Sequence, residues 1–184
     1  MVATAQKTGE LGWQATDFEL EGVDGRRHRL ADLKGERGTL VMFICNHCPY
    51  VKGVIDELVQ DCKALEAEGV KSVAIMPNDT DAYPADSFDN MKAFAKAHGF
   101  GFPYLIDRTQ EVARSYGAVC TPDIFGFDRE LKLRYRGRVQ EVRGTAPVKG
   151  AKREMLEAMH QIARTGQGPA EQVPAIGCSI KWRS

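Results

Sequence analysis

The sequence predicts an α/β fold in which a central mixed β-sheet is flanked by helices. Two apolar runs, at residues 39–44 and 70–76, are rich in β-branched side chains and enclose a segment of helical period, so they predict a βαβ unit with parallel strands. Residues 124–138 predict an antiparallel hairpin. The first apolar run ends in a Cys-x-x-Cys pair, which is the candidate site.

Length and charge restrict the class of protein. The 184 residues are enough for one domain with a substantial core, and 25 basic residues balance 25 acidic ones. This balance gives no indication of nucleic acid or an anionic membrane surface as a partner. Residues 1–13 lack the apolar segment of an export signal, and no stretch approaches the ~20 apolar residues of a membrane span. We therefore expect a cytoplasmic protein that binds neither nucleic acid nor membrane.

The N-terminal part is expected to precede the first buried strand with little regular structure. Residues 1–14 are predicted to form a flexible arm. Alternating polar and apolar residues on both sides of a turn at 22–25 predict a hairpin over 17–30. One helical turn is expected at 31–35.

Pro49 predicts the start of a helix, because proline suits the first turn, where its missing N–H is not needed. The apolar residues that follow recur at three- and four-residue spacing, and Gly69 is expected to end the helix. These apolar residues are Val51, Val54, Ile55, Leu58, Cys62 and Leu65. Cys62 is expected to pack as a small hydrophobic side chain.

The loop at 77–85 follows the second buried strand, at the sheet edge where α/β proteins place their sites. Four aspartates lie in or just after this loop: Asp79, Asp81, Asp86 and Asp89. They could hold a metal ion, but a solvated loop is favoured. Asp86 or Ser87 can cap a helix that runs to about residue 98.

The rest of the chain predicts short elements and a separate tail. A strand at 102–106 and a helix at 109–116 precede the hairpin, and a helix follows that ends near residue 164. Residues 15–166 are predicted to form the main domain. Residues 167–184 are predicted to be a tail that packs on it as an extra strand or cover.

Cys45 and Cys48 are expected where a strand ends and a helix begins. The first N–H groups of a helix carry partial positive charge, which stabilises a thiolate. We expect Cys45 to lie at this junction with its pKa below the usual value of about 8.5, and His47 to add positive charge when protonated. Two cysteines at this spacing can form a disulfide, which couples attack by one sulfur to resolution by the other.

A zinc half-site is the alternative for Cys-x-x-Cys. A four-ligand site would need a second such pair, which the sequence lacks, so the redox pair is favoured. Five cysteines cannot all pair within one chain, and stable disulfides are unusual in the cytoplasm. The other histidines, His28, His98 and His160, are expected to be solvated, and the basic run at 134–138 is expected to be an exposed strand face.

The order of these elements resembles the thioredoxin superfamily, and more closely its peroxiredoxin-like (redoxin) branch. Residues 43–51, 120–123, the hairpin at Asp128 and residues 177–182 carry the resemblance, which covers about residues 13–182. It implies a thioredoxin-like fold over residues 15–166 and a thiol–disulfide oxidoreductase with no cofactor. The implied partners are a disulfide-bearing protein or a small thiol as substrate, and an external dithiol as reductant.

The resemblance also implies roles for individual residues. Cys45 would attack, Cys48 would resolve, and His47 matches a histidine that stabilises the thiolate in strongly oxidising relatives. Pro122 would be the cis proline beside the disulfide, which leaves the backbone of Thr121 able to pair with an extended substrate segment.

Two further cysteines leave alternatives open. Cys120 lies two residues before Pro122, so the fold would bring it near the pair, and Cys178 lies in the tail. Each is a second resolving thiol, a ligand for a soft metal such as Zn²⁺ or Cu⁺, or a packed thiol.

Peroxide reduction is a further alternative. True peroxiredoxins carry Pro-x-x-x-Thr-x-x-Cys, with the peroxidatic cysteine at the position of Cys48. Here Val41 and Cys45 occupy the proline and threonine positions, so both groups that polarise the peroxide bond are missing. Disulfide exchange is therefore favoured over a peroxidase and over a soft-metal module.

Overall fold

The computed structural model describes residues 2–5 and 10–184. Within these residues a seven-stranded sheet has the order β3-β2-β6-β5-β4-β8-β9. Its centre is parallel and consists of β4 (Gly38–Phe43), β5 (Val70–Met76) and β6 (Tyr104–Ile106). The outer strands pair antiparallel: β2 (Glu19–Gly22), β3 (Arg27–Arg29), β8 (Asp123–Asp128) and β9 (Leu133–Tyr135). The predicted mixed sheet is confirmed.

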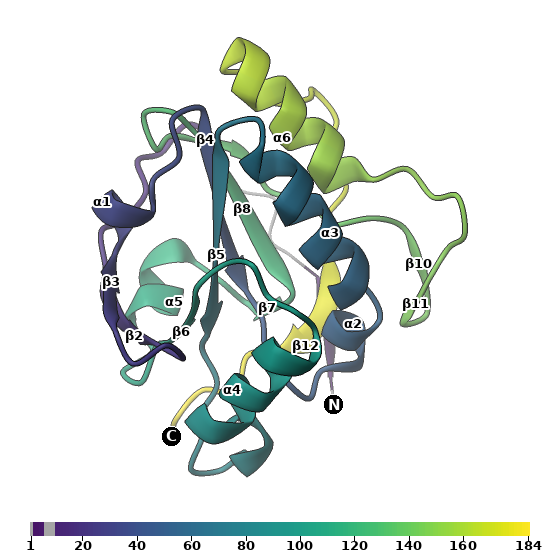
Figure 1. The fold of residues 1–184 in the computed structure, drawn as a ribbon. Helices are drawn as coiled ribbons and strands as arrows, with labels where there is room; N and C mark the ends of the chain where they lie inside the picture. Colours follow the sequence, from purple (N-terminus) through teal and green to yellow (C-terminus); the bar gives the residue numbers. More distant parts are fainter. Residues whose placement is uncertain (1, 6–9) are drawn as a thin grey trace.

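Helices cover both faces of this sheet. They are α1 (Leu30–Leu33), α2 (Pro49–Lys52), α3 (Ile55–Glu66), α4 (Phe88–Ala97), α5 (Glu111–Tyr116) and α6 (Glu154–Thr165). Figure 1 shows α3 and α6 side by side on one face, with α1 and α5 on the other. A 3-10 turn, η1 (Pro84–Asp86), precedes α4.

Strand β4 divides the core because its side chains alternate between the two faces. Leu40 and Met42 pack with the inner residues of α3 and α6. Val41 and Phe43 pack into the other cluster, where Tyr116 of α5 makes edge contacts with neighbouring aromatic rings. All six residues of β4 are buried, so the strand that leads to the cysteine pair is fixed from both sides.

The single helix predicted from Pro49 to Gly69 is wrong, because the segment folds as α2 and α3 with a break at Gly53 and Val54. A Cβ on Gly53 would overlap the backbone carbonyl oxygen of Thr145. The approach of a distant loop therefore requires glycine here, and a helix-period pattern cannot report such a contact. A small hairpin precedes α6 and consists of β10 (Val142–Arg143) and β11 (Ala146–Pro147).

A second, three-stranded sheet forms at the chain ends. The C-terminal strand β12 (Ile176–Ser179) lies between β1 (Ala3–Ala5) and β7 (Cys120–Thr121), antiparallel to both. The expectation of a flexible arm at 1–14 is therefore wrong for Ala3–Ala5, because β12 offers them a strand edge. Residues 1 and 6–9 of that arm lie outside the described residues. The domain limits at residues 14 and 166 stay a prediction.

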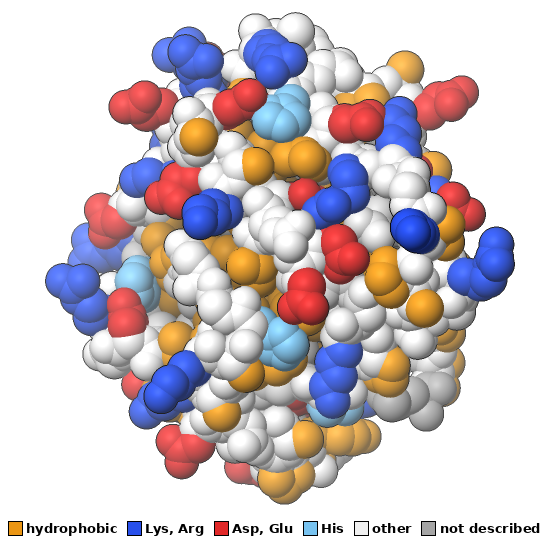
Figure 2. All heavy atoms as spheres, turned by 45° about the vertical axis from the view of Figure 1, so that its right-hand side comes forward, with side chains coloured by type: hydrophobic (Ala, Val, Ile, Leu, Met, Phe, Trp, Pro, Cys, Tyr) orange, Lys and Arg blue, Asp and Glu red, His pale blue; other side chains and the backbone are white. Residues whose placement is uncertain are grey.

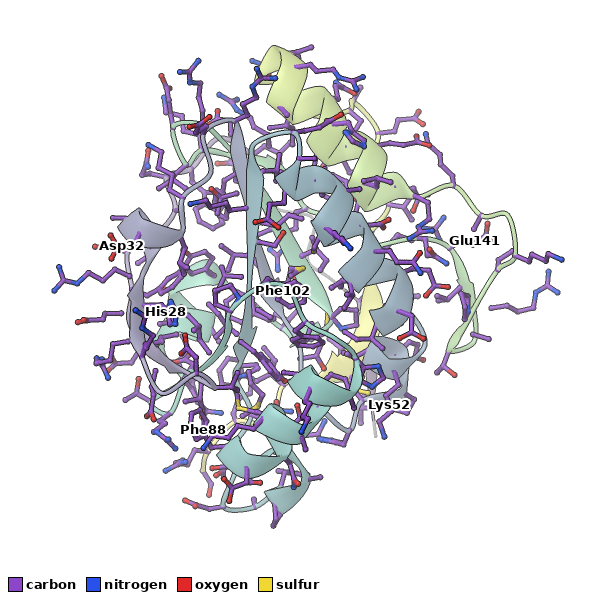
Figure 3. All side chains as sticks on the ribbon, viewed as in Figure 1. His28, Asp32, Lys52, Phe88, Phe102 and Glu141 are labelled. Carbon is purple, nitrogen blue, oxygen red and sulfur yellow. The ribbon has the colours of Figure 1, made fainter. Side chains whose placement is uncertain are left out.

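The basic run at 134–138 is not an exposed face, which corrects the expectation. Arg136 pairs with the buried Asp123 at 3.1 Å, and the other two arginines pair with carboxylates of β8 and α6. The three histidines expected to be solvated each face a carboxylate near the surface. One of them, His28, lies on the far side of the molecule from Lys52 at the end of α2 (Figure 3).

Charges are interspersed over the face in Figure 2, where acidic and basic side chains alternate without a large patch of one sign. Among the described residues, no helix has the length and apolar character needed to cross a membrane. The expected cytoplasmic location stays a prediction.

Candidate active site

The cysteine pair lies in the turn that connects β4 to α2. Strand β4 ends at Phe43, α2 begins at Pro49, and Cys48 is the N-cap of α2. The structure thus places Cys48, and not Cys45, directly at the start of the helix. The sequence pattern located the junction between strand and helix correctly. It did not predict how long the turn between them is, and this length places Cys45 before the helix.

Cys48 is the sulfur on which the other groups converge. Its Sγ lies 2.7 Å from Sγ of Cys178 and 3.2 Å from the backbone oxygen of Thr121. The Sγ of Cys45 lies 3.4 Å from Oγ1 of the same threonine. All these sulfurs are buried, and no disulfide joins the cysteines, each of which is among the described residues.

The electrostatics of the pair are the reverse of the expectation. Hydrogen bonding with Cys45, and further hydrogen bonds from Cys178 and the Val51 backbone, lower the pKa of Cys48 to about 5 despite burial. The pKa of Cys45 is raised well above its usual value by its interaction with Cys48, by burial and by the charge of Asp86. These shifts favour the thiolate on Cys48 and the proton on Cys45.

Asp86 holds the turn between Cys45 and Cys48 in place. Its carboxylate is fully buried, accepts hydrogen bonds from the Asn46 backbone N–H at 2.8 Å and from Nδ2 of Asn78 at 2.9 Å, and lies 2.6 Å from Nδ1 of His47. Asn46 in turn accepts a hydrogen bond from the Tyr104 hydroxyl at 2.8 Å. Asp86 thus orients both residues between the two cysteines.

Sequence reasoning treated Asp86 as a loop or capping residue and missed this position. Ser87 is the residue that caps α4, through Asn90 N–H at 3.2 Å. The one available signal was the place of Asp86 after β5, at the end of the parallel strands. Of the other aspartates, Asp79 and Asp81 pair with Arg183 and Asp89 is exposed, so the four do not converge on one site.

A different group could hold a metal ion. One ligand atom each from Cys45, His47 and Asp86 lie within 4.8 Å of one another. Thiolate, imidazole and carboxylate together suit Zn²⁺. Cys120, offered from the sequence as a soft-metal ligand, is not in this set: its sulfur points to the Pro122 carbonyl oxygen at 3.5 Å, and burial raises its pKa.

The Thr121–Pro122 peptide bond is cis, as the resemblance implies for Pro122. The expectation that the Thr121 backbone is left to pair with a substrate is wrong for this structure, because Thr121 pairs with Cys178 of β12. A small pocket adjoins Pro122, with Tyr50, Val139 and Ile176 among its lining residues. The side chain of Ile176 is 54% exposed there and offers an apolar contact at the pocket wall.

Residues 11–136 match the model of the AhpC/TSA family, which is more than half of the chain. The chain belongs to the AhpC/TSA family. It is accordingly an oxidoreductase, and solved structures with a thioredoxin-like fold confirm the predicted fold. One of these, a putative thiol:disulfide interchange protein DsbE from Chlorobium tepidum, superimposes with a TM-score of 0.61 at 22% identity and covers 84% of this chain and 97% of its own.

Closer similarities come from two solved structures and a named relative. An uncharacterized conserved protein from Geobacillus kaustophilus is 45% identical, with a TM-score of 0.94 over 100% of this chain and 97% of that one. A hypothetical protein from Sinorhizobium meliloti 1021 is 37% identical, with a TM-score of 0.91 over 98% and 99%. Thiol-disulfide oxidoreductase ResA from Bacillus thuringiensis is 27% identical over 77% of this chain and 74% of its own length.

In this AhpC/TSA protein the state of Cys48 should follow pH with a midpoint near 5, since its pKa is lowered to about 5. Above that pH the sulfur is a thiolate, and below it the thiol is protonated and unreactive. Thiolate absorbance in the ultraviolet, taken as the difference between the wild type and Cys48→Ser, measures this directly. Cys62 is the internal control, because burial raises its pKa to about 12. A midpoint near the ordinary value of about 8.5 would contradict the assignment.

Proposed function

We propose that this chain is a thiol–disulfide oxidoreductase in which Cys48 is the attacking thiolate and Cys45 is the resolving thiol. The observation that carries the proposal is the position of Cys48 at the start of α2, where its sulfur receives hydrogen bonds that lower its pKa. The named ResA relatives support the same class of reaction. These roles are the reverse of those that the resemblance implied, in which Cys45 attacks and Cys48 resolves.

The reaction is a pair of exchanges. The Cys48 thiolate attacks one sulfur of a substrate disulfide, forms a mixed disulfide and releases the other sulfur as a thiolate. Cys45 then attacks Cys48, which frees the reduced substrate and leaves a Cys45–Cys48 disulfide. The proton of Cys45 goes to the departing substrate thiolate. An external dithiol returns the pair to the reduced state, so that no organic cofactor is needed.

His47, Thr121 and Pro122 support this reaction from around the sulfurs. His47, held by Asp86, places an imidazole nitrogen beside Cys45. The hydroxyl of Thr121 contacts Cys45, and Pro122 borders the small pocket. We propose that this pocket receives the residue next to the substrate disulfide, in a disulfide-bearing protein or a small disulfide.

Oxidised glutathione tests this function in the wild-type protein. We expect the thiols of Cys45 and Cys48 to be lost together and restored by dithiothreitol, while Cys62 stays reduced. Peptide mapping should find a disulfide within the one tryptic peptide that contains both residues. If both thiols persist under these conditions, the proposal is wrong.

A soft-metal site is the second candidate, and the cluster of Cys45, His47 and Asp86 is the observation that favours it. Metal analysis of freshly purified protein separates the two functions. One equivalent of bound zinc or copper with protected thiols would favour the metal module. Rapid peroxide consumption without disulfide exchange would instead favour the peroxidase.

A further inference from the structure

The C-terminal strand β12 occupies the place where an extended substrate segment would pair. Cys178 is in register with Thr121, the residue before the cis proline, and Ser179 is in register with Cys120. This is strand addition to the edge of β7, the mode by which many domains bind extended peptides. The chain thus presents its own tail to its own cysteine pair.

Close backbone contact fixes the tail in this position. A Cβ on Gly177 would overlap the carbonyl oxygen of Thr121, so that only glycine allows β12 to approach β7 this closely. On its other edge β12 pairs with β1, where Cys178 is in register with Ala3. Cys178 is therefore held between two strands with its sulfur 2.7 Å from that of Cys48.

We propose that Cys178 is a third redox residue of this enzyme, which attacks Cys48 and forms a Cys48–Cys178 disulfide in exchange equilibrium with the Cys45–Cys48 disulfide. This inference rests on the proposed function, because it needs a disulfide at Cys48 to act on. It makes the tail an internal substrate, and Cys48 the sulfur shared by both disulfides.

The step balances without a further oxidant. The Cys178 sulfur bonds to the Cys48 sulfur, the Cys45–Cys48 bond breaks, and Cys45 leaves with the electron pair. The proton of Cys178 passes to the departing sulfur of Cys45. One disulfide is consumed and one is formed, so the oxidation state of the protein does not change.

The charge around Cys178 changes in the direction that this step requires. In the reduced protein, burial and the hydrogen bond with Cys48 raise the pKa of Cys178 to about 12. When Cys48 enters a disulfide it loses its negative charge, and that hydrogen bond to a thiolate is lost. The positive charge of Lys181, which lowers the pKa of Cys178, is then no longer opposed by the negative charge of Cys48.

Two single variants, treated with oxidised glutathione, separate this inference from the proposed function. In Cys178→Ser, formation of the Cys45–Cys48 disulfide tests the proposed function alone. In Cys45→Ser, glutathione added to Cys48 should be displaced by Cys178, and mapping should find the tryptic peptide of Cys48 cross-linked to that of Cys178. Cys120→Ser in the Cys45→Ser background is the matched control and should leave the cross-link intact.

The outcomes are distinct. Glutathione that stays on Cys48 of Cys45→Ser, without a cross-link, overturns the inference even when Cys178→Ser still forms its disulfide. If Cys45→Ser does not fold, the wild type replaces it: partly oxidised protein should contain the same cross-linked peptide, and its absence overturns the inference. Gly177→Ala should then reduce the cross-linked fraction severalfold, because the added methyl group displaces β12 from Thr121. An unchanged fraction contradicts a role for this strand pairing.

Discussion

Cys48→Ser should lower the rate of disulfide exchange by about a thousandfold or more, because it removes the attacking thiolate and the sulfur shared by both proposed disulfides. Cys45→Ser should keep the first attack and lose normal turnover, since a mixed disulfide at Cys48 then has only the slower release through Cys178. Reduction of insulin disulfides by dithiothreitol measures turnover. Mass spectrometry of the quenched reaction measures the mixed disulfide.

Cys62→Ser is the control for the loss of a buried thiol. Its sulfur packs 3.9 Å from that of Met42 in the core and should not affect exchange beyond about twofold. In the opposite pattern, Cys48→Ser accumulates a mixed disulfide at Cys45. This result would show that Cys45 is the attacking residue, as the resemblance implied. Turnover that survives in both variants would remove the pair from the mechanism.

The parts of the fold that follow from local pattern could be predicted from the sequence. Strands β4 and β5 are almost entirely buried, and the apolar runs at residues 39–44 and 70–76 predict this directly. The hairpin of β8 and β9 follows from a turn between two strand-like runs. The cis bond at Pro122 came only from the family resemblance, because neither spacing nor composition distinguishes it from a trans bond.

The parts that were missed depend on contacts between distant segments. At the break in the predicted helix, Gly53 lies against the carbonyl oxygen of Thr145, and the buried Asp86 accepts hydrogen bonds from Asn46 and Asn78. The proximity of Cys178 to Cys48 depends on the pairing of β12 with β7, across 130 residues of sequence. Since a pattern of hydrophobicity holds no information on such pairings, the site could be located from the sequence but its third sulfur could not be assigned.

Arg136→Ala should lower the free energy of unfolding by about 3–5 kcal/mol, the usual cost of removing one partner from a buried ion pair. Arg136 is nearly buried, lies 3.1 Å from Asp123, donates to the Gly117 carbonyl oxygen at 3.0 Å and lies over the ring of Phe125 at 4.4 Å. The variant removes this cation from a fully buried carboxylate on β8, beside Pro122. Urea denaturation followed by circular dichroism gives the free energy.

Arg27→Ala is the matched control, because Arg27 pairs with Glu19 at 3.8 Å with 61% of its side chain exposed. Exposed pairs contribute about 0–1 kcal/mol, so this variant should unfold close to the wild type. Asp123→Asn combined with Arg136→Ala should recover part of the loss, since a neutral amide costs less to bury than a carboxylate. Equal stabilities for Arg136→Ala and Arg27→Ala would show that the Asp123 pair does not hold β8 in place.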